Sequence, residues 1–237
     1  MGKVALVTGA SGSGIGRSTA LTLARDGFDI AVNFRSDEAA ANAVVEAVRG
    51  LGVAAAAVRA DLFDLAQAQV LVPRVIETFG RLDALVIGPG AGWHPEPPDH
   101  LAAEDALADT RQEVLPVFAL MPQAIAAMAA QGCGRIVGIA TNPRLPSPSY
   151  AYNTAKQART AALLGMVDLC WRQRITVNVV APGPVDAIQT LAEAVALNGD
   201  FSRSTASISP QDIAEIVAFL CSDRGRFITG NVVGTYF

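Results

Sequence analysis

The stretch that decides the fold of this chain is KVALVTGASGSGIGR, residues 3–17. Its first part, residues 3–9, is a short apolar run that ends in glycine, as a buried strand does. From residue 16 onward, apolar side chains recur at helical spacing up to a glycine at position 27. The glycines between strand and helix let the backbone turn sharply and bring its N–H groups close to a pyrophosphate. A tight structural turn would use the same letters, but this place in the chain favours a nucleotide site.

The same alternation continues along the chain. Strands are predicted at residues 29–34, 53–61, 82–88, 135–140, 175–180 and 227–233, and helices at 37–52, 65–80, 100–131, 150–173 and 210–222. Continuous apolar strands that alternate with helices indicate a parallel sheet covered on both faces, and right-handed crossovers make it doubly wound. We therefore expect a single α/β domain over residues 1–237, a Rossmann-type parallel sheet of about seven strands with helices on both faces.

Composition narrows the possible functions. Of the 237 residues, 51% are hydrophobic and 17% are charged, which predicts a well-filled core. No apolar run reaches the roughly 20 residues that cross a bilayer, and the first residues do not resemble a signal peptide. A cytoplasmic protein without a membrane partner is expected. The net charge is −4 and no basic block occurs, which argues against nucleic acid as a partner.

The cysteines and histidines are few and scattered. Cys133, Cys170 and Cys221 form no CxxC motif, and the only histidines are His94 and His100. Buried free thiols in a reducing compartment are the expected state of the cysteines. No metal site is predicted.

Ligands of a doubly wound sheet bind beyond the carboxyl ends of its strands, so the cofactor preference is sought after the second strand. The sequence there reads NFRSDE, with Asn33 and Arg35 where an acidic residue would bind the 2′-hydroxyl of NAD. Arginine suits a 2′-phosphate because its planar fork forms two hydrogen bonds with phosphate, and Arg17 could add a second contact. We predict NADP(H) rather than NAD(H); the alternative is that both arginines are ordinary surface charges. Asp61, at the end of the third strand, is placed to meet the adenine.

The segment SYAYNTAK, residues 149–156, holds two tyrosines and one lysine. In a helix, residues four apart differ by about 40° around the axis and residues six apart by about 240°. Tyr152 therefore shares a face with Lys156, and Tyr150 does not. A nearby ammonium lowers the pKa of a phenol from its usual value of about 10, so this pair could transfer a proton near neutral pH. A half-buried ring beside a solvated lysine is the alternative, but the position after the fifth strand favours catalysis.

With these motifs the chain resembles the short-chain dehydrogenase/reductase family, and most of all its NADPH-dependent 3-oxoacyl-(acyl-carrier-protein) reductase branch. The likeness covers nearly the whole chain and is carried by TGAS…GIGR, NFRSDEAA, GRIVGIAT, YNTAK, VNVVAPGPV and SPQDIAEIVAFLCSD. It implies hydride transfer between a nicotinamide and the carbonyl or alcohol carbon of a small molecule. By this likeness Tyr152 protonates the carbonyl oxygen, and Lys156 holds the nicotinamide ribose and lowers the pKa of the tyrosine. A homo-oligomer, tetramer or dimer, is also implied, with the final strand at a subunit contact.

The predicted contacts of NADP(H) follow the carboxyl edge of the sheet, where Pro182 and Gly183 are implied to shape the wall beside the nicotinamide. The full set is Gly9, Ser11, Gly12, Ser13, Gly14, Ile15, Gly16, Arg17, Asn33, Arg35, Asp61, Leu62, Gly88, Lys156, Pro182, Gly183 and Val185.

Several letters of the family pattern are missing near the predicted chemistry. The glycine turn is one residue longer than usual, and the NNAG loop after the fourth strand reads IGPG, residues 87–90. This loop must be held differently, and the segment that follows it is one candidate for the support. Thr141 stands where a serine would bind the substrate oxygen, and its hydroxyl can donate the same hydrogen bond. Ser147 and Ser149 are alternatives to it.

Glu113 stands where an asparagine would support a water beside Lys156, and this leaves two outcomes open. The carboxylate could pair with Lys156 and strengthen its charge or bind the water chain, or it could take up the hydrogen bonds of the lysine and raise the pKa of Tyr152. We predict Tyr152, Lys156, Thr141 and Glu113 as the catalytic group. His94 is either a second acid near the substrate or a plain loop histidine.

Residues 184–205 are expected to form a substrate lid, and their apolar half-helix suggests an apolar or acyl-chain-like substrate. The leading hypothesis is NADPH-dependent reduction of a ketone or 3-oxoacyl-type carbonyl. One alternative is a non-redox enzyme such as a dehydratase, epimerase or lyase, which Glu113, Thr141, His94 and the altered loop motivate. Another is a weakly active binding protein that keeps the nucleotide for stability.

Overall fold

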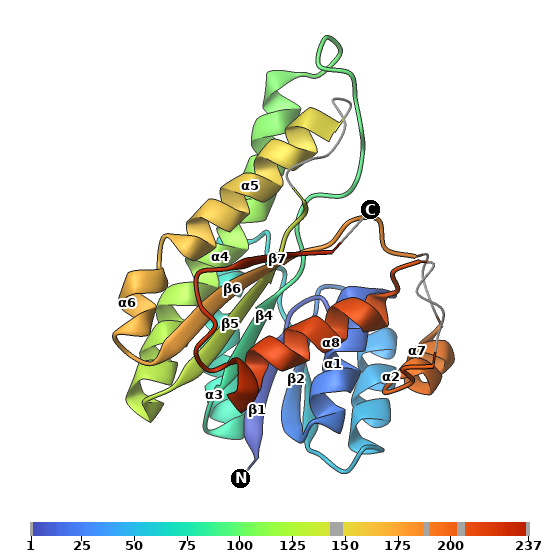
Figure 1. Cartoon of the computed structure of the whole chain (residues 1–237), viewed down its shortest axis with the longest axis vertical. Coiled ribbons are helices and arrows are strands. Elements are labelled where there is room, and N and C mark those ends of the chain that lie inside the picture. Colours follow the sequence, from blue (N-terminus) through green and yellow to red (C-terminus); the bar gives the residue numbers. More distant parts are fainter. Residues whose placement is uncertain (1, 143–148, 187–189, 203–206, 236–237) are drawn as a thin grey trace.

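The computed structural model describes residues 2–142, 149–186, 190–202 and 207–235 of the chain. Within these residues seven parallel strands form one sheet in the order β3-β2-β1-β4-β5-β6-β7 (Figure 1). The strands are β1 (Lys3–Val7), β2 (Phe28–Phe34), β3 (Ala55–Arg59), β4 (Ala84–Ile87), β5 (Gly134–Ile139), β6 (Ile175–Ala181) and β7 (Val232–Gly234). The order reverses between β1 and β4, so the predicted doubly wound sheet is confirmed.

Helices cover both faces of the sheet, each face with its own apolar core. One layer contains α3 (Leu65–Phe79), α4 (Ala103–Gln131), α5 (Tyr150–Leu164) and α6 (Val167–Trp171). The other layer contains α1 (Ile15–Arg25), α2 (Glu38–Arg49), α7 (Leu191–Leu197) and α8 (Pro210–Cys221). A short 3-10 turn, η2 (Asp223–Gly225), follows α8. The inner strands are buried on both sides, which explains why they read as unbroken apolar runs.

Local signals set many of the helix ends. Asp64 caps α3 by accepting hydrogen bonds from the N–H groups of Ala66 and Gln67. Ser209 begins α8 through a capping box with Asp212, and Pro210 occupies the first turn. Gly132 ends α4 with a left-handed φ of 78°, which a residue with a side chain rarely adopts.

Three predicted elements differ in the structure. The helix expected over residues 150–173 breaks at Gly165 into α5 and α6, since glycine is a poor helix former. The region between residues 181 and 209, for which no element was predicted among the strands and helices above, contains α7, which a capping box between Thr190 and Glu193 starts. The last strand is limited to Val232–Gly234, because the chain before it forms η2 and a turn.

One helix in the described part of the chain, α4, is long and apolar enough to cross a membrane by length and composition. Its most apolar window is 56% buried inside the protein, where it packs on the sheet between α3 and α5. Burial in this core accounts for its hydrophobicity.

The carboxyl ends of all strands point to the same edge of the sheet, since every pair in it is parallel. Above that edge the N-terminal parts of α4 and α5 rise together (Figure 1). The residues that directly follow β4, β5 and β6 therefore lie near the N-terminal half of α5, where the sequence places its tyrosine and lysine.

Candidate active site

The turn after β1 is shaped by close backbone approach. Gly9 has a φ of 63°, and a Cβ there would lie 2.6 Å from Cγ of Pro89. A Cβ on Gly16 would lie 2.7 Å from the carbonyl oxygen of Gly9. A hollow of about 240 Å³ opens here at the N-terminus of α1, and its walls include Gly9, Gly14, Ile15 and Gly16. This cradle of backbone at a helix N-terminus suits a pyrophosphate. Ser11, Gly12 and Ser13 belong to the same turn but do not line the hollow.

Asn33 holds this turn in place. Its side chain is 1% exposed; its Oδ1 accepts a hydrogen bond from Gly9 N–H at 3.2 Å, and its Nδ2 donates to the carbonyls of Val58 and Ala60. The amide therefore ties the turn to β2 and β3, which is a supporting role; its predicted contact with the cofactor stays a prediction.

The two arginines predicted to meet a 2′-phosphate differ in exposure. Arg35 lies beyond the end of β2 with an exposed side chain. Its carbonyl accepts a hydrogen bond from Nε of Arg59 at 3.2 Å, which brings a second arginine to this edge. Arg17 is buried in the first turn of α1, where burial lowers its pKa and the nearby charge of Glu193 acts in the opposite direction.

The residues predicted to meet the adenine follow β3. The carboxylate of Asp61 accepts a hydrogen bond from Phe63 N–H at 2.9 Å, and its own N–H donates to Gln67. Leu62 is buried in the core at 4% exposure. A contact of Leu62 with a ligand would therefore involve its backbone.

A larger cavity of about 580 Å³ adjoins the glycine turn. Its lining contains eight of the predicted site residues together with Trp93, Ile139, Ala140 and Pro184; the predicted ones are Ile15, Gly88, Thr141, Tyr152, Lys156, Pro182, Gly183 and Val185. Ile15, Gly88 and Ile139 line both hollows, so the two form one groove along the carboxyl edge of the sheet.

Tyr152 and Lys156 lie one turn apart on α5 and share the face that lines the cavity. The Nζ atom of Lys156 lies 5.3 Å from the centre of the Tyr152 ring. Trp93, from the loop after β4, packs edge-on against the same ring with 5.2 Å between the ring centres. Tyr150 is 58% exposed at the start of α5. The structure therefore brings Tyr152, and not Tyr150, to Lys156.

The pKa of Tyr152 is raised to about 12. Burial of the phenol is the main cause, the negative charge of Glu113 adds to it, and Arg159 acts in the opposite direction. The lowered pKa expected from the lysine is therefore wrong. Glu113 pairs with Lys156, as the first outcome envisaged, and also raises the pKa of Tyr152, as the second did. Tyr152 is a neutral phenol near physiological pH.

Glu113 binds Lys156 directly. Its Oε1 atom lies 2.9 Å from Nζ of Lys156 and accepts a hydrogen bond from Ala91 N–H at 2.7 Å. The Glu113 side chain is fully buried and the Lys156 side chain is 8% exposed. Burial and Arg159 lower the pKa of Lys156, and Glu113 opposes them.

Arg159 is a buried site residue that was not among those predicted from the sequence. It is fully buried on α5, and its Nε lies 2.7 Å from Oε2 of Glu113. Its guanidinium also donates to the carbonyls of Gly88, Pro89 and Ile139. The spacing Tyr152, Lys156, Arg159 is i, i+4, i+7, so the face shared by these side chains was visible in the sequence.

The altered loop after β4 is thereby held from below. Arg159 binds the carbonyls of Gly88 and Pro89, Glu113 binds Ala91 N–H, and Gly88 N–H donates to Oγ1 of Thr8 at 3.0 Å. The segment after the loop, which was one candidate for this support, adds the contact of Trp93 with the tyrosine ring.

Thr141 lies at the cavity wall beside Tyr152, 7% exposed, and its carbonyl accepts a hydrogen bond from Gln157 at 3.2 Å. Of its alternatives, Ser149 is buried at the start of α5, and Ser147 lies outside the described residues.

Nε2 of His94 lies 3.2 Å from Oδ1 of Asp109 on α4. His94 does not line the cavity.

The expected lid is only partly described, because residues 187–189 and 203–206 fall outside the described part. Pro184 and Val185 line the cavity. Helix α7 instead packs on α1, where Nδ2 of Asn198 donates to the carbonyl of Leu21, and it lies next to α2 in Figure 1. The lid function of this segment stays a prediction. At the chain end, Oγ1 of Thr235 accepts a hydrogen bond from Gly183 N–H at 3.2 Å, which fixes the cavity wall.

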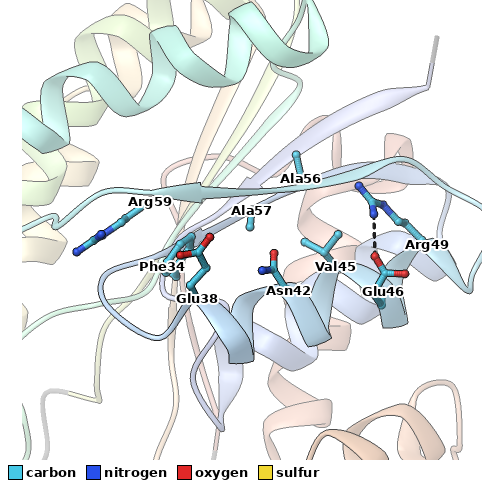
Figure 2. A pocket seen from close by; sticks show the side chains of 9 residues that line it. All are labelled: Phe34, Glu38, Asn42, Val45, Glu46, Arg49, Ala56, Ala57 and Arg59. Atoms are coloured by element: carbon cyan, nitrogen blue, oxygen red, sulfur yellow. Dashed lines mark hydrogen bonds and ion pairs between the residues drawn. The ribbon is translucent and has the colours of Figure 1, made fainter.

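A separate hollow of about 350 Å³ lies between α2 and the edge strand β3 (Figure 2). It is lined by Phe34, Glu38, Asn42, Val45, Glu46, Arg49, Ala56, Ala57 and Arg59. Arg49 is bound to Glu46 at 2.7 Å, and Figure 2 shows Arg59 pointing away from the other side chains. None of the predicted site residues lines this hollow.

The three cysteines are free, but Cys133 is exposed, which corrects the expectation that all are buried. Burial raises the pKa of the Cys170 thiol to about 11 and that of Cys221 to about 12. These two thiols are therefore poor nucleophiles.

The parallel strand order and the groove at its carboxyl edge place this chain among doubly wound α/β proteins with a ligand site at the switch point. The pattern of the enoyl-(acyl carrier protein) reductase family matches residues 9–235. The chain belongs to the short-chain dehydrogenase/reductase family of oxidoreductases, as its motifs indicated.

Two relatives align along nearly their whole lengths. An uncharacterised oxidoreductase of Methylorubrum extorquens is 36% identical, and the alignment covers 98% of this chain and 95% of the relative. The 3-oxoacyl-[acyl-carrier-protein] reductase FabG of Staphylococcus aureus is 33% identical, with 98% and 96% covered.

Two solved structures share the fold at 32% identity. Acetoin dehydrogenase from Enterobacter cloacae has a TM-score of 0.85, with 99% of this chain and 94% of that chain covered. A short-chain dehydrogenase from Burkholderia cenocepacia in complex with NADP has a TM-score of 0.83, with 98% and 95% covered.

Proposed function

We propose that this protein reduces the carbonyl group of a small molecule to an alcohol with NADPH. The observation that carries the proposal is the single groove in which the glycine turn after β1 and the Tyr152–Lys156 pair face the same space. A dinucleotide held by its pyrophosphate at the N-terminus of α1 would extend along this groove toward Tyr152.

The residues of the groove fit the cofactor. A Cβ on Gly14 would meet nothing within 4 Å, so a phosphate can approach the backbone there, while Gly9 and Gly16 let the turn pack closely against Pro89 and itself. Lys156 lines the cavity and offers an ammonium for ribose hydroxyls. Bound NADPH would supply a hydride to the carbonyl carbon and leave as NADP⁺.

Tyr152 supplies the proton. When a hydride forms the new C–H bond, the electron pair of the C=O π bond would pass to the oxygen, and the phenol would break its O–H bond to give that oxygen a proton. The raised pKa of about 12 keeps the phenol protonated, so it is ready to donate. Thr141 lies on the same cavity wall and can donate a second hydrogen bond to the oxygen.

A preference for NADPH over NADH is supported at the end of β2. The exposed Arg35 lies there, and the nearest acidic residue, Asp37, caps α2 by accepting a hydrogen bond from Ala40 N–H at 2.9 Å. That carboxylate is therefore already hydrogen-bonded at the start of α2 and is less available to a ribose 2′-hydroxyl. The Burkholderia neighbour was solved with NADP.

The substrate we propose is a ketone or 3-oxoacyl-type carbonyl with an apolar flank. Trp93, Ile139, Pro184 and Val185 give the cavity apolar walls around the polar group at Tyr152. The relatives named above include a 3-oxoacyl-[acyl-carrier-protein] reductase and an acetoin dehydrogenase.

The test is NADPH consumption at 340 nm with a panel that contains a 3-oxoacyl thioester, a vicinal diketone and a cyclic ketone. Wild type should turn over at least one of them, and Tyr152→Phe should bind NADPH equally well but lose turnover. Tight NADPH binding without turnover of any carbonyl by wild type would contradict the proposal.

A non-redox reaction receives less support from the geometry. Such a reaction needs a base, and the candidate is the carboxylate of Glu113. This carboxylate already contacts Lys156, Arg159 and Ala91 N–H. Product formation without any change in nicotinamide absorbance would nevertheless select that alternative.

The cytoplasmic location and the homo-oligomer stay predictions; light scattering coupled to size-exclusion chromatography distinguishes monomer, dimer and tetramer.

A further inference from the structure

Two departures from the family pattern lie against Arg159 in space. The loop IGPG at residues 87–90, Glu113 on α4 and Arg159 on α5 come from three separate segments, yet Arg159 contacts both of the others. A buried guanidinium and a buried carboxylate thus occupy the space beneath the loop after β4.

All three nitrogen atoms of the Arg159 guanidinium make polar contacts. Its Nε lies 2.7 Å from Oε2 of Glu113 and also donates to the backbone carbonyl of Glu113 at 3.2 Å. Nη1 donates to the carbonyls of Gly88 at 2.9 Å and Ile139 at 3.0 Å, and Nη2 donates to the carbonyl of Pro89. One planar fork therefore joins β5, α4 and the loop, which a single-headed lysine cannot do.

The charges form a chain that ends in the cavity. Glu113 lies between two cations, with Oε2 toward Arg159 and Oε1 toward Lys156. Arg159 and Glu113 are fully buried, whereas Lys156 reaches the cavity wall. Oε1 also accepts the hydrogen bond of Ala91 N–H, so two cations and one backbone donor hold the carboxylate, and the carboxylate in turn holds the ammonium.

We propose that Arg159 is a positioning residue that works with Glu113 as a buried clamp, holding the loop after β4 in place and aiming the ammonium of Lys156 at the cavity. The loop IGPG has no polar side chain of its own, so its bracing comes from Arg159 and Glu113. The loop part of the proposal stands on its own, and its effect on Tyr152 rests on the proposed function.

The loop is tested by hydrogen exchange of the peptide that contains Gly88 and Ala91, measured by mass spectrometry. In Arg159→Met and in Glu113→Gln this peptide should exchange faster by about tenfold or more, the factor that a lost charge-assisted hydrogen bond corresponds to. Arg111→Met is the matched control, because Arg111 is exposed on α4 two residues from Glu113, and its loop should exchange as in wild type. Unchanged exchange in Arg159→Met would overturn the clamp.

The effect on the tyrosine is tested by the pH profile of alcohol oxidation. Tyr152 is faced by Lys156, Glu113 and Arg159, of which Glu113 raises its pKa and Arg159 lowers it. Glu113→Gln should therefore move the profile to lower pH and Arg159→Met to higher pH. If the two residues were merely structural, their variants would not shift the pH profile in opposite directions. Shifts in the same direction would therefore contradict the positioning role.

Arg159→Lys separates charge from shape and covers the case in which Arg159→Met does not fold. It should keep the pH profile close to that of wild type, since the positive charge remains, while the loop still exchanges faster. The kcat of Arg159→Met should fall by about tenfold to 100-fold with a nearly unchanged KM for NADPH, as a misplaced catalytic group produces. If wild type reduces no carbonyl, the proposed function fails, and the exchange experiment still decides the clamp.

Discussion

The Nζ atom of Lys156 lies 2.9 Å from Oε1 of Glu113 and 5.3 Å from the centre of the Tyr152 ring. The lysine thus has a fixed counter-charge within the protein, and that counter-charge also acts on the tyrosine. Glu113 raises the pKa of the phenol on top of the larger effect of burial. The site is thereby arranged for a neutral proton donor, which suits reduction of a carbonyl better than oxidation of an alcohol.

The pH dependence of oxidation follows from this arrangement. In the proposed reaction, oxidation with NADP⁺ would need the phenolate of Tyr152, and with a pKa of about 12 only a small fraction is ionised at neutral pH. The rate should rise about tenfold per pH unit from neutral pH to the alkaline limit of stability, because each unit raises the phenolate fraction tenfold. Reduction should be nearly independent of pH over the same range. A plateau of the oxidation rate near neutral pH would show that the phenol ionises far more easily.

Trp93 is expected to select the substrate. It forms a wall of the cavity and touches the Tyr152 ring, although it is 56% exposed. Trp93→Ala should raise KM for carbonyls with apolar flanks by about tenfold, the factor that corresponds to losing an apolar contact of 1–1.5 kcal/mol, and should leave small diketones nearly unaffected. Trp171→Ala is the control, since this tryptophan is similarly exposed on α6. Equal KM changes for large and small substrates would argue against the wall.

Arg35 is expected to determine the choice of dinucleotide. Removing one charged hydrogen bond to a phosphate costs about 1.5–3 kcal/mol, so Arg35→Ala should weaken NADPH binding by tenfold or more and leave NADH binding nearly unchanged. Isothermal titration calorimetry measures both affinities. Arg49→Ala provides the comparison, because Arg49 is an exposed arginine bound to Glu46 on α2. Parallel losses for both dinucleotides would show that Arg35 does not read the 2′-phosphate.

The buried ion pair should be visible in the stability of the fold. Arg159→Met leaves the buried Glu113 with one cation fewer and should lower the free energy of unfolding by about 3–5 kcal/mol. The double variant Glu113→Leu/Arg159→Met removes both charges. Its loss in the free energy of unfolding should be smaller than the losses of Glu113→Leu and Arg159→Met added together. Urea denaturation gives these values, with Arg111→Met expected within about 0.5 kcal/mol of wild type. Additive losses would mean that the two side chains do not act as a pair.

The sequence predicted those features that depend on short-range spacing. The glycine turn at residues 9–16 and the alternation of apolar runs are local, and they were sufficient for the doubly wound sheet. Helical arithmetic chose Tyr152 over Tyr150 for the same reason. It could also have pointed to Arg159, seven residues after Tyr152, but an arginine in an amphipathic helix is ordinarily taken for an exposed residue.

The support of the altered loop depends on long-range contacts and could not be read from spacing. Arg159 is 70 residues from Pro89 and 46 from Glu113 along the chain. The direction in which the pKa of Tyr152 shifts likewise depends on burial, which only the packed structure gives. Asn33 shows the same limit, because its place at the end of β2 predicted a ligand contact while its amide is used to hold the glycine turn.

A pair of neighbouring glycines gives the sharpest test of the loop. A Cβ on Gly90 would collide with the carboxylate of Glu113, whereas a Cβ on Gly92 would meet nothing within 4 Å. The carboxylate cannot easily move aside, because Lys156, Arg159 and Ala91 N–H hold it. Gly90→Ala should therefore lower kcat by about tenfold or more through a displaced Lys156, and Gly92→Ala should match wild type. Equal activity of the two variants would show that the position of Glu113 does not matter for turnover.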